Sequence, residues 1–503
     1  MTLRELMGEG APDVEITGLA YDSRSVSHGT LFFCVSGLCR DGHAFAPEAV
    51  AAGAAALVVE RPLGLGVPEV LVPSARAAMA PAAARFFGDP TAELDVVGVT
   101  GTNGKTTTAF LVRFLLEAAG RPCGLLGTVT AVAGGVEQQV VRTTPEAIDL
   151  QRAFDTMLRA GDRACAMEVS SHALELHRAD AIHWAAAIFT NLTQDHLDFH
   201  PSMEDYFLAK RRLFLAAPRV SIVNVDDPFG RRLADEIPGT VRFAVERPAD
   251  YRATAVETDW AGTRFRLEGP GVDLELGSPL PGRFNVYNVT GAAVAALVLG
   301  VDPAAIVAAV SAAGPIPGRF EPVDEGQGFA VVVDYAHTPD SLDNLLRAAR
   351  ELAEGRLIVV FGCGGDRDRG KRPVMGEIAA RLADVAVVTS DNPRSEDPEA
   401  IIRDVMGGAG DAAEAVVDRR EAIGSAIELA RPDDVVVIAG KGHEQGQEFA
   451  GGRTLPFDDV AVAREVLRGA ALSRGGGGRP IGWPAWPAPA RWRPRRRRAD
   501  PSG

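Results

Sequence analysis

The chain has 503 residues, which is too long for one hydrophobic core and predicts about three domains of ordinary size. Its composition, 46% hydrophobic and 24% charged, is typical of a globular enzyme. The net charge of −15 argues against a nucleic-acid-binding protein, because attraction to phosphates needs a basic face; anionic ligands would need local basic residues or metal ions to receive them.

Cysteine usage and the N-terminus predict a cytoplasmic protein. The five cysteines are an odd number without paired spacing, which argues against a disulfide framework or a zinc site and indicates a reducing compartment. The first residues, MTLRELMGEGAPDVE, lack the basic and apolar regions of a secretion signal. No apolar run reaches the roughly 18–20 residues that a membrane helix needs, so we expect no integral membrane segment.

Residues 1–95 are expected to form a small N-terminal α/β domain. The apolar runs Thr30–Val35 and Ala55–Val59 have the length of strands, and the Ala-rich stretch Ala44–Ala52 between them has a helical pattern.

Residues 96–318 are expected to form a central domain, which opens with a strand at Leu94–Thr100, a Gly-rich turn and a helix at Thr106–Ala119. This alternation of strands and helices predicts a doubly wound, mostly parallel sheet with helices on both faces. The segment Arg252–Leu276 has a charged, hairpin-like pattern, and a helix is expected at Asn285–Leu299. Further strands are predicted at Ala164–Val169, Ala186–Thr190 and Val220–Asn224.

The segment GPIPGRFEPV (Gly314–Val323) is the best candidate for a domain junction, because it holds two Pro and two Gly. Residues 319–469 then predict a Rossmann-like C-terminal α/β domain. Residues 470–503 hold eight Arg and one Asp and are predicted to be a disordered basic tail, either a weak anchor to anionic surfaces or a dispensable extension. The strands expected in the C-terminal domain are Ala330–Asp334, Arg356–Phe361, Val385–Ser390 and Asp434–Ala439.

A phosphate-binding loop is predicted at VVGVTGTNGKTTT (Val96–Thr108), which follows a strand and opens a helix. In that context backbone N–H groups and the helix N-terminus cradle phosphates, a lysine neutralises the β/γ-phosphates and a hydroxyl reaches Mg²⁺. The usual first glycine is replaced by Val99, so an incidental Gly-rich turn is the alternative. An ATP loop alone does not distinguish hydrolases, kinases and ligases. The loop residues expected to bind ATP are Gly101, Thr102, Asn103, Gly104, Lys105, Thr106 and Thr107.

Several motifs, in order along the chain, resemble those of the Mur ligases and of the related folylpolyglutamate synthetases. The resemblance runs from about Asp22 to Phe457 and implies an ATP-dependent ligase that forms an amide bond. Besides the phosphate loop, the motifs are MEVSSHAL (Met167–Leu174), NLTQDHLDFH (Asn191–His200), DYFLAKRRLF (Asp205–Phe214), PGRFNVYN (Pro281–Asn288), GPIPGRFE (Gly314–Glu321) and VVVDYAHTPDSL (Val331–Leu342).

Metal ligands are predicted beside the loop. Glu168 ends a strand of the same sheet, where its carboxylate suits Mg²⁺; a purely structural glutamate is the alternative. The resemblance implies that His196 is a ligand of a second Mg²⁺, although alone it would be taken as a core histidine. It also implies that Lys210 is carbamylated by CO₂ to N6-carboxylysine, which requires a neutral and therefore buried amine. The alternative is an unmodified, phosphate-binding lysine.

The resemblance assigns three further residues to the nucleotide. Asn288 would face the adenine, Arg319 the phosphates and Asp334 the ribose. Because Arg319 and Asp334 lie beyond the predicted junction, ATP would be held between the central and C-terminal domains. Domain closure would complete the site and exclude water from an acyl-phosphate.

The N-terminal segment YDSRSVSHGTLFFCVSGLCRDGHAF (Tyr21–Phe45) resembles a UDP-binding domain. Within it, the resemblance implies that Tyr21, Ser23 and the Leu38–Arg40 stretch contact uridine diphosphate. Thr143, Thr144, Ser170 and Arg178 match positions that hold the muramoyl-dipeptide. Arg142 and Leu176 depart from the family pattern of Asn and Gln, which puts those two contacts in doubt.

The acceptor amino acid is inferred from DNPR (Asp391–Arg394), which resembles the signature of the enzymes that use meso-diaminopimelate. A guanidinium at Arg394 can grip the second carboxylate of that substrate bidentately, with Arg367 and Asn392 assisting. The alternative is a β-turn with Pro393 at a favoured position. The predicted diaminopimelate-binding residues are Arg367, Asp391, Asn392, Pro393, Arg394, Gly440 and Glu444.

The sequence therefore predicts a ligase that adds meso-2,6-diaminopimelate to UDP-N-acetylmuramoyl-L-alanyl-D-glutamate, with Lys105, Lys210 and His196 as catalytic residues. The expected partners are these two substrates, ATP and Mg²⁺, and a monomer is expected. A folate ligase should lack the uridine segment and a lysine-adding ligase should lack Arg394. A phosphate-loop regulator should hydrolyse ATP without the muramoyl-dipeptide.

Overall fold

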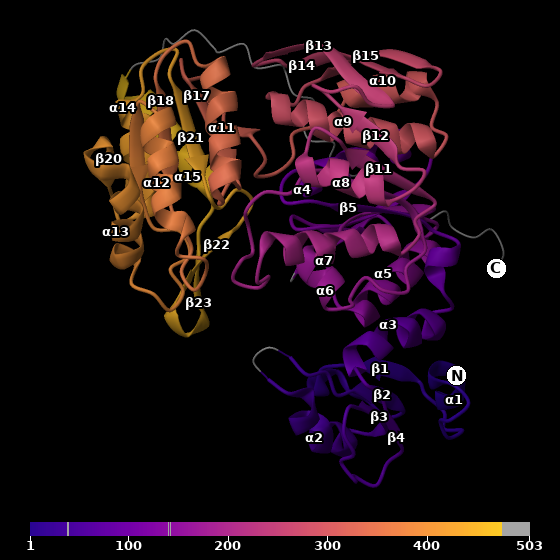
Figure 1. The fold of residues 1–503 in the computed structure, drawn as a ribbon. Helices are drawn as coiled ribbons and strands as arrows, with labels where there is room; N and C mark the ends of the chain where they lie inside the picture. Colours follow the sequence, from indigo (N-terminus) through magenta and orange to yellow (C-terminus); the bar gives the residue numbers. More distant parts are fainter. Residues whose placement is uncertain (38–39, 139, 141, 475–503) are drawn as a thin grey trace, which may run out of the picture.

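The computed structural model describes residues 1–37, 40–138, 140 and 142–474. Leu38, Cys39 and residues 475–503, and with them most of the predicted tail, lie outside the described residues. Three sheets and one hairpin organise the chain, with the N-terminal sheet below the central one and the C-terminal sheet at its side (Figure 1). Among the described residues, no helix combines the length and apolarity that crossing a bilayer requires.

The N-terminal sheet is parallel throughout, in the order β1-β2-β3-β4. Helix α3 packs on it and also on α5 of the central sheet, because Met79 and Ala80 share a core with Ala147 and Ile148. The elements are α1 (Leu3–Met7), β1 (Gly18–Ala20), β2 (Thr30–Phe33), α2 (Ala46–Ala51), β3 (Ala54–Val59), β4 (Glu69–Leu71) and α3 (Ala75–Phe86).

The central sheet has eleven strands in the order β15-β14-β13-β12-β11-β10-β5-β9-β6-β7-β8. Its middle strands are parallel, mostly apolar and almost entirely buried, as expected for strands covered on both faces. The strands are β5 (Asp95–Thr100), β6 (Cys123–Leu126), β7 (Ala131–Ala133), β8 (Val136–Gln138), β9 (Ala164–Glu168), β10 (Trp184–Phe189), β11 (Val220–Asn224), β12 (Val241–Ala244), β13 (Tyr251–Asp259), β14 (Gly262–Gly269) and β15 (Val272–Ser278).

Helices cover both faces of this sheet. Alternate residues of β5 face different cores: Val97 packs with α4, α9 and α10, whereas Val96 packs with α5, α7 and α8. This is the predicted doubly wound arrangement, and the predicted hairpin-like segment forms the antiparallel edge strands β13–β15. The helices are α4 (Lys105–Ala118), α5 (Ala147–Ala160), α6 (Ser171–Glu175), α7 (Met203–Leu215), α8 (Pro228–Glu236), α9 (Arg283–Val298) and α10 (Pro303–Ser311).

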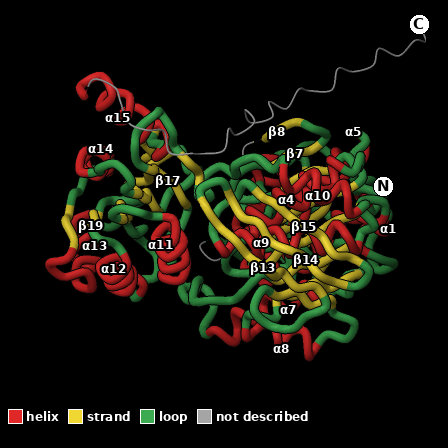
Figure 2. Tube along the Cα trace, turned by 90° about the horizontal axis from the view of Figure 1, so that it is seen from above, coloured by secondary structure: helices red, strands yellow, loops and turns green. Residues whose placement is uncertain are grey.

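The C-terminal sheet has the order β16-β17-β21-β18-β19-β20 and is parallel except at β16. Seen from above, α11, α12 and α13 lie on one side of it and α14 and α15 on the other (Figure 2). The elements are β16 (Glu321–Pro322), β17 (Ala330–Asp334), α11 (Pro339–Leu352), β18 (Leu357–Phe361), α12 (Lys371–Leu382), β19 (Val385–Val388), α13 (Pro398–Ala409), β20 (Ala413–Ala415), α14 (Arg419–Leu429), β21 (Val435–Ala439), the hairpin β22 (Gly446–Phe449) and β23 (Arg453–Pro456), and α15 (Asp459–Arg474).

Candidate active site

The predicted phosphate loop connects β5 to α4 at the carboxyl edge of the central sheet. Gly104 adopts a left-handed conformation immediately before the helix, and a Cβ there would come within 2.3 Å of Asn288 Oδ1. Gly101 is equally constrained, because a Cβ would meet Thr190 Oγ1. The loop therefore requires glycine at both positions, and it brings Asn288 of α9 against the start of α4.

Two lysines converge on this loop. Lys105 Nζ donates to Gly101 O (3.0 Å) and Thr102 O (2.8 Å), and Lys210 Nζ of α7 donates to the same Gly101 O (2.8 Å). Lys210 is only 1% exposed, and burial followed by the charge of Lys105 lowers its pKa well below the usual value. Burial also lowers the pKa of Lys105. Two ammonium groups on one carbonyl repel each other, so the site favours a neutral amine at Lys210.

Glu168, the last residue of β9, lies at the centre of a network of hydroxyl groups. Its carboxylate accepts hydrogen bonds from Thr106 Oγ1 (3.0 Å), Thr128 Oγ1 (3.0 Å) and the Thr128 backbone N–H (2.7 Å). Arg319 crosses from the C-terminal domain and donates to Thr106 Oγ1 at 2.9 Å. Its guanidinium also lies over the ring of Tyr335.

These oxygen donors fit a hard cation such as Mg²⁺. The Thr106 hydroxyl and the Glu168 carboxylate touch each other, so one ion could contact both. Among the described residues, no group of three or more His, Cys, Asp and Glu side chains is arranged to hold a metal. Mg²⁺ does not need one, because it is often bound by one or two carboxylates together with substrate phosphates.

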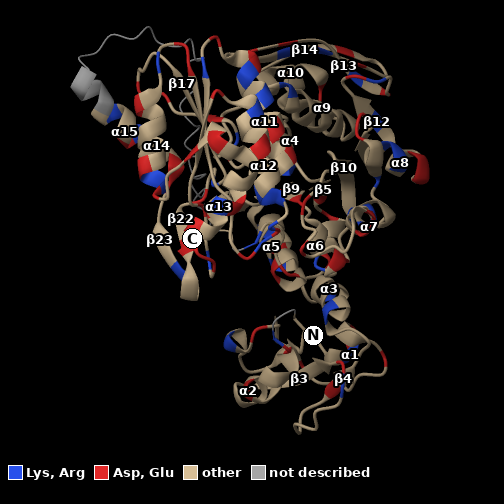
Figure 3. Ribbon diagram, turned by 60° about the vertical axis from the view of Figure 1, so that its left-hand side comes forward, with Lys and Arg blue, Asp and Glu red and all other residues tan. Residues whose placement is uncertain are grey.

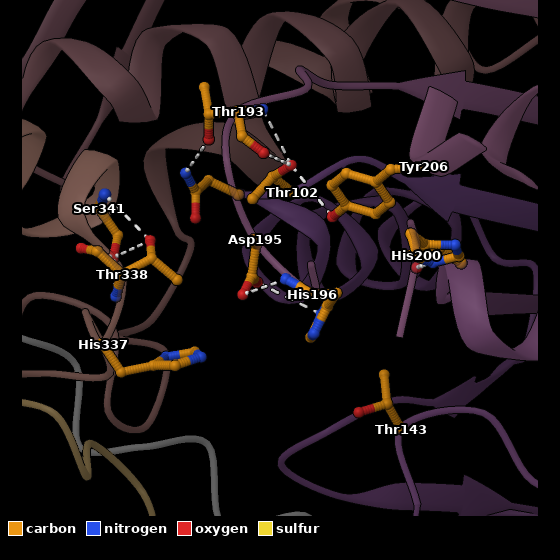
Figure 4. Close-up of polar contacts among 12 residues, drawn as sticks. Thr102, Thr143, Thr193, Asp195, His196, His200, Tyr206, His337, Thr338 and Ser341 are labelled. Carbon is orange, nitrogen blue, oxygen red and sulfur yellow. Dashed lines mark hydrogen bonds and ion pairs between the residues drawn. The ribbon is translucent and has the colours of Figure 1, made fainter. Parts of the chain in front are cut away.

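His196 follows β10 and stands next to both lysines. Its backbone is left-handed (φ 55°), its N–H donates to the Asp195 carboxylate (2.8 Å), and its ring lies 3.3 Å from the same carboxylate (Figure 4). Burial lowers the pKa of His196, so the imidazole is neutral and can accept a proton or a metal ion. Its ring also packs edge-on against His172, whose pKa burial lowers to about 4.

Asn288, which is buried, and Asp334, which is half-buried, are both predicted to contact the nucleotide and lie in polar surroundings. Asn288 Nδ2 donates to Asn285 Oδ1 at 3.0 Å. The Asp334 carboxylate accepts from the backbone N–H groups of Phe320 (2.7 Å) and Ala336 (2.8 Å), and burial raises its pKa. Asp334 thus ties the segment that carries Arg319 to the end of β17.

A side-chain clasp joins the C-terminal domain to the loop. Asp340 Oδ2, in the first turn of α11, accepts from Asn103 Nδ2 (2.7 Å) and Thr193 Oγ1 (3.1 Å). Asp340 is half-buried in this contact, and burial raises its pKa. In Figure 4, His337 from the same C-terminal segment faces the Asp195–His196 pair.

The residues predicted for the muramoyl-dipeptide gather beside Glu168. Thr143 Oγ1 lies 3.1 Å from Thr128 Oγ1, and Thr144 Oγ1 donates to the Glu168 backbone oxygen (2.9 Å). Ser170, which caps α6, donates its backbone N–H to Thr144 Oγ1 at 3.1 Å.

Three arginines surround one buried carboxylate next to these hydroxyls. Glu146 pairs with Arg178 (3.0 Å), with Arg76 of α3 (2.7 Å) and with Arg142 (3.4 Å). Burial lowers the pKa of Arg178, and its Nε lacks a well-directed hydrogen bond. The cluster has surplus positive charge, which suits an anionic ligand between the N-terminal and central domains.

The predicted uridine-binding residues lie farther along the N-terminal sheet. Tyr21 follows β1, its hydroxyl donates to Asp149 Oδ2 of α5 (2.6 Å), and burial raises its pKa. Ser23 begins the short helical turn after β1. Leu176 ends α6.

The predicted diaminopimelate residues meet on the loops after β19 and β21. Asn392 Nδ2 donates to Glu444 Oε2 (2.9 Å), and the fully buried Lys441 donates to both Asn392 Oδ1 (2.9 Å) and Glu444 Oε2 (3.0 Å). Gly440 must be glycine, because a Cβ would lie 2.5 Å from Asp391 Oδ2. The two loops therefore form one polar cluster.

Arg394, with Pro393 before it, forms the outer part of this cluster. Arg394 has a left-handed backbone (φ 52°), and its guanidinium donates to Glu448 Oε2 (2.8 Å) and Gly365 O (2.9 Å). The side chain of Arg367 instead donates to Asp366 O at 3.0 Å, on the exposed side of the loop. In Figure 3, the ribbon around β22, β23 and α13 carries both acidic and basic residues.

The sequence interpretation missed several residues that connect these groups. Thr128 contacts Glu168 and Thr143, and its backbone lies beside the imidazole of His443. Burial lowers the pKa of His443 to about 4. Asp340, Glu146 and Lys441 were missed as well. The position of Thr128 just after β6, at the same sheet edge as the phosphate loop, was the available signal.

Comparisons with known proteins agree along most of the chain. Three family models match: "Mur ligase family, catalytic domain" at residues 15–87, "Mur ligase middle domain" at 99–296 and "Mur ligase, glutamate ligase domain" at 318–442. A UDP-N-acetylmuramoyl-L-alanyl-D-glutamate–2,6-diaminopimelate ligase from Syntrophomonas wolfei is 47% identical, covering 92% of this chain and 96% of the relative. The ligase of the same name from Streptomyces coelicolor is 46% identical, covering 93% and 96%.

Solved structures give the same result for the fold. A structure of a UDP-N-acetylmuramoyl-L-alanyl-D-glutamate–2,6-diaminopimelate ligase matches with a TM-score of 0.67 and 33% identity, covering 93% of this chain and 99% of the other. A MurF ligase from Thermotoga maritima in complex with ADP matches with a TM-score of 0.64 at 18% identity, covering 93% and 99%; this likeness concerns the fold alone.

Proposed function

The chain belongs to the Mur ligase family, and from that premise we propose that it joins meso-2,6-diaminopimelate to the D-glutamate γ-carboxylate of UDP-N-acetylmuramoyl-L-alanyl-D-glutamate. This acid–amino-acid ligation uses ATP, releases ADP and phosphate, and supplies a precursor of peptidoglycan and thus of cell shape and division. We place it in the cytoplasm, in keeping with buried free thiols at Cys34, Cys123, Cys165 and Cys363.

One observation carries the proposal: three predicted subsites adjoin at Thr128. Thr128 contacts Glu168, which is predicted for ATP and metal, and Thr143, which is predicted for the dipeptide. Its backbone also lies beside His443, the neighbour in sequence of Glu444, which is predicted for the amino acid. A phosphate, a peptide carboxylate and an amine must meet within bonding distance for an amide to form, and this junction lets them do so.

The chain's own residues would bind ATP and position it. Lys105 would exchange its backbone carbonyl partners for the β- and γ-phosphates, and Arg319 would contact the γ-phosphate beside Thr106. Asn288 would face the adenine and Asp334 the ribose. Thr106, Glu168 and His196 would hold Mg²⁺, which supplies charge neutralisation for the phosphates when bound.

Lys210 is proposed to carry a carbamate. Its neutral amine nitrogen would attack the carbon of CO₂, form an N–C bond and lose one proton to give an anionic N6-carboxylysine. The modification would turn the repulsion between Lys210 and Lys105 into attraction, because a negative group would then stand beside the ammonium of Lys105.

The chemistry then takes two steps. A γ-carboxylate oxygen of the precursor attacks the γ-phosphorus, and the bond to ADP breaks to leave an acyl-phosphate. The diaminopimelate amine attacks the acyl carbon, a C–N bond forms, and phosphate and one proton leave. Closure held by the Asp340 clasp would keep water away from the acyl-phosphate.

The family resemblance supports the roles proposed for the residues that would bind the two other substrates. Tyr21 and Ser23 would contact the uridine diphosphate, and Thr143, Thr144, Ser170 and Arg178 the muramoyl-dipeptide. Arg394 would grip the distal carboxylate of diaminopimelate, supported by Asn392, while Gly440 and Glu444 hold its distal amine and carboxylate.

Phosphate release with purified protein tests the proposal. Release should require ATP and the UDP-muramoyl-dipeptide together and should be far faster with meso-diaminopimelate than with L-lysine. Equal rates with lysine would remove the specificity claim. ATP hydrolysis that ignores the muramoyl-dipeptide would instead indicate a nucleotide-binding regulator.

A further inference from the structure

The DNPR segment is fastened to β22 by backbone contacts at Glu448. The Glu448 backbone N–H donates to Asn392 Oδ1 (3.0 Å), and the Arg394 backbone N–H donates to the Glu448 backbone oxygen (3.0 Å). Arg394 also bridges to Phe449 as an isolated parallel pair. The Cα of Glu448 is therefore held beside Arg394 whatever its side chain does.

The side chain of Glu448 already makes the kind of contact proposed for the substrate. Its carboxylate accepts from Arg394 Nε at 2.8 Å, and Arg394 Nη1 donates to Gly365 O at 2.9 Å. A side-on bidentate grip on a carboxylate uses Nε together with one Nη. Because Glu448 occupies Nε, a second carboxylate cannot make that grip while Glu448 stays.

Glu448 can leave at little cost. Its side chain is 51% exposed, against 25% for Arg394, so the carboxylate can rotate into water while the backbone contacts remain. Exposed ion pairs of this kind are weak and depend on salt. The guanidinium, in contrast, is held at Nη1 by a backbone carbonyl and stays in place.

We propose that Glu448 is an internal placeholder carboxylate, which neutralises Arg394 in the empty enzyme and must be displaced by the distal carboxylate of the amino-acid substrate. The inference rests on the proposed role of Arg394 in the function above. Glu448 thereby sets the affinity for diaminopimelate. A substrate whose far end is an ammonium, such as lysine, brings no anion to exchange and leaves Glu448 in place.

The Glu448→Gln variant tests this. Glutamine keeps the shape and can still accept a hydrogen bond from Arg394, but it removes the competing charge. We expect the KM for meso-diaminopimelate to fall roughly three- to five-fold with kcat and the KM for ATP unchanged, and the gain to shrink at high salt. Use of lysine should not improve. An unchanged or higher KM for diaminopimelate would overturn the proposal, since Glu448 would then only support Arg394.

The double variant Arg394→Ala/Glu448→Gln separates this inference from the function on which it rests. It should behave like Arg394→Ala alone, because Glu448 acts only through Arg394. If Arg394→Ala leaves the kcat/KM for diaminopimelate unchanged, the proposed role of Arg394 in specificity is wrong. If Arg394→Ala lowers that kcat/KM but Glu448→Gln does not lower the KM, only the proposed role of Glu448 is wrong. The matched control is Glu465→Gln, which removes an exposed carboxylate paired with Arg420 and should leave every KM unchanged.

Discussion

The two lysines at the phosphate loop and Arg394 of the amino-acid loops are held in different ways. Lys105 and Lys210 donate to backbone carbonyls in surroundings that lower both pKa values. Arg394 is partly exposed and pairs with an exposed carboxylate. Burial fixes in place the groups that every turnover needs, whereas an exchangeable pair suits a group that must recognise one substrate among several.

Of all the substitutions considered, replacing Lys105 of the buried pair with methionine should lower activity most. We expect kcat to fall by about 10³-fold, on the order of 4 kcal/mol, with every amino acid tested, because a preorganised charge at the phosphates is lost. Phosphate release and thermal unfolding measured together check this. A fall in kcat with diaminopimelate but not with other amino acids would contradict the idea that the phosphate loop serves every turnover and Arg394 only one substrate.

Replacing Lys210 with glutamine should have the next largest effect. We expect kcat to fall on the order of 10²-fold, because the amide cannot form a carbamate. The parent enzyme should also slow in CO₂-depleted buffer and recover with bicarbonate, and the variant should not respond. Activity of the parent enzyme that is indifferent to bicarbonate would favour an unmodified lysine.

Replacing Arg394 with alanine should impair the use of diaminopimelate and leave ATP binding unaffected. The kcat/KM for diaminopimelate should fall about 10²-fold, equivalent to about 3 kcal/mol, as expected for a lost charge-assisted bidentate contact. The KM for ATP should stay the same. Unchanged diaminopimelate kinetics would remove Arg394 from the site.

Replacing Asp340 with alanine should have the smallest effect, because it weakens closure between the two regions and leaves Lys105, Lys210 and Arg394 in place. We expect kcat to fall roughly ten-fold, with more ATP hydrolysed per amide formed, since water would reach the acyl-phosphate. Asp343→Ala is the control, because Asp343 lies one turn further along α11 but pairs with Arg347 and Arg381 of its own domain. Equal behaviour of the two variants would show that the clasp has no special role.

Much of the fold could be predicted from local patterns. The strands Val220–Asn224 and Ala330–Asp334 were predicted with the observed bounds, because short, mostly apolar runs of that length mark strands buried on both faces. Glu168 was placed correctly at the end of its strand for the same reason. The predicted phosphate loop could be picked out from the sequence because Gly101, Gly104 and Lys105 lie within five residues of each other, between a strand and a helix.

The connecting residues could not be predicted in this way. Thr128 is an ordinary threonine in the sequence and becomes central only when β6 lies beside β9. Asp340 and Asn103 are far apart along the chain, and only the closed arrangement of two domains brings them to 2.7 Å.

By itself, then, the sequence determined the fold class, the phosphate loop and the family to which the chain belongs, because these depend on the order of short local motifs. Tertiary structure alone decided that Lys105 and Lys210 share one carbonyl and that Glu448 occupies Arg394. Such contacts depend on how separate loops come to lie against each other, and burial and charge act only after that arrangement has formed.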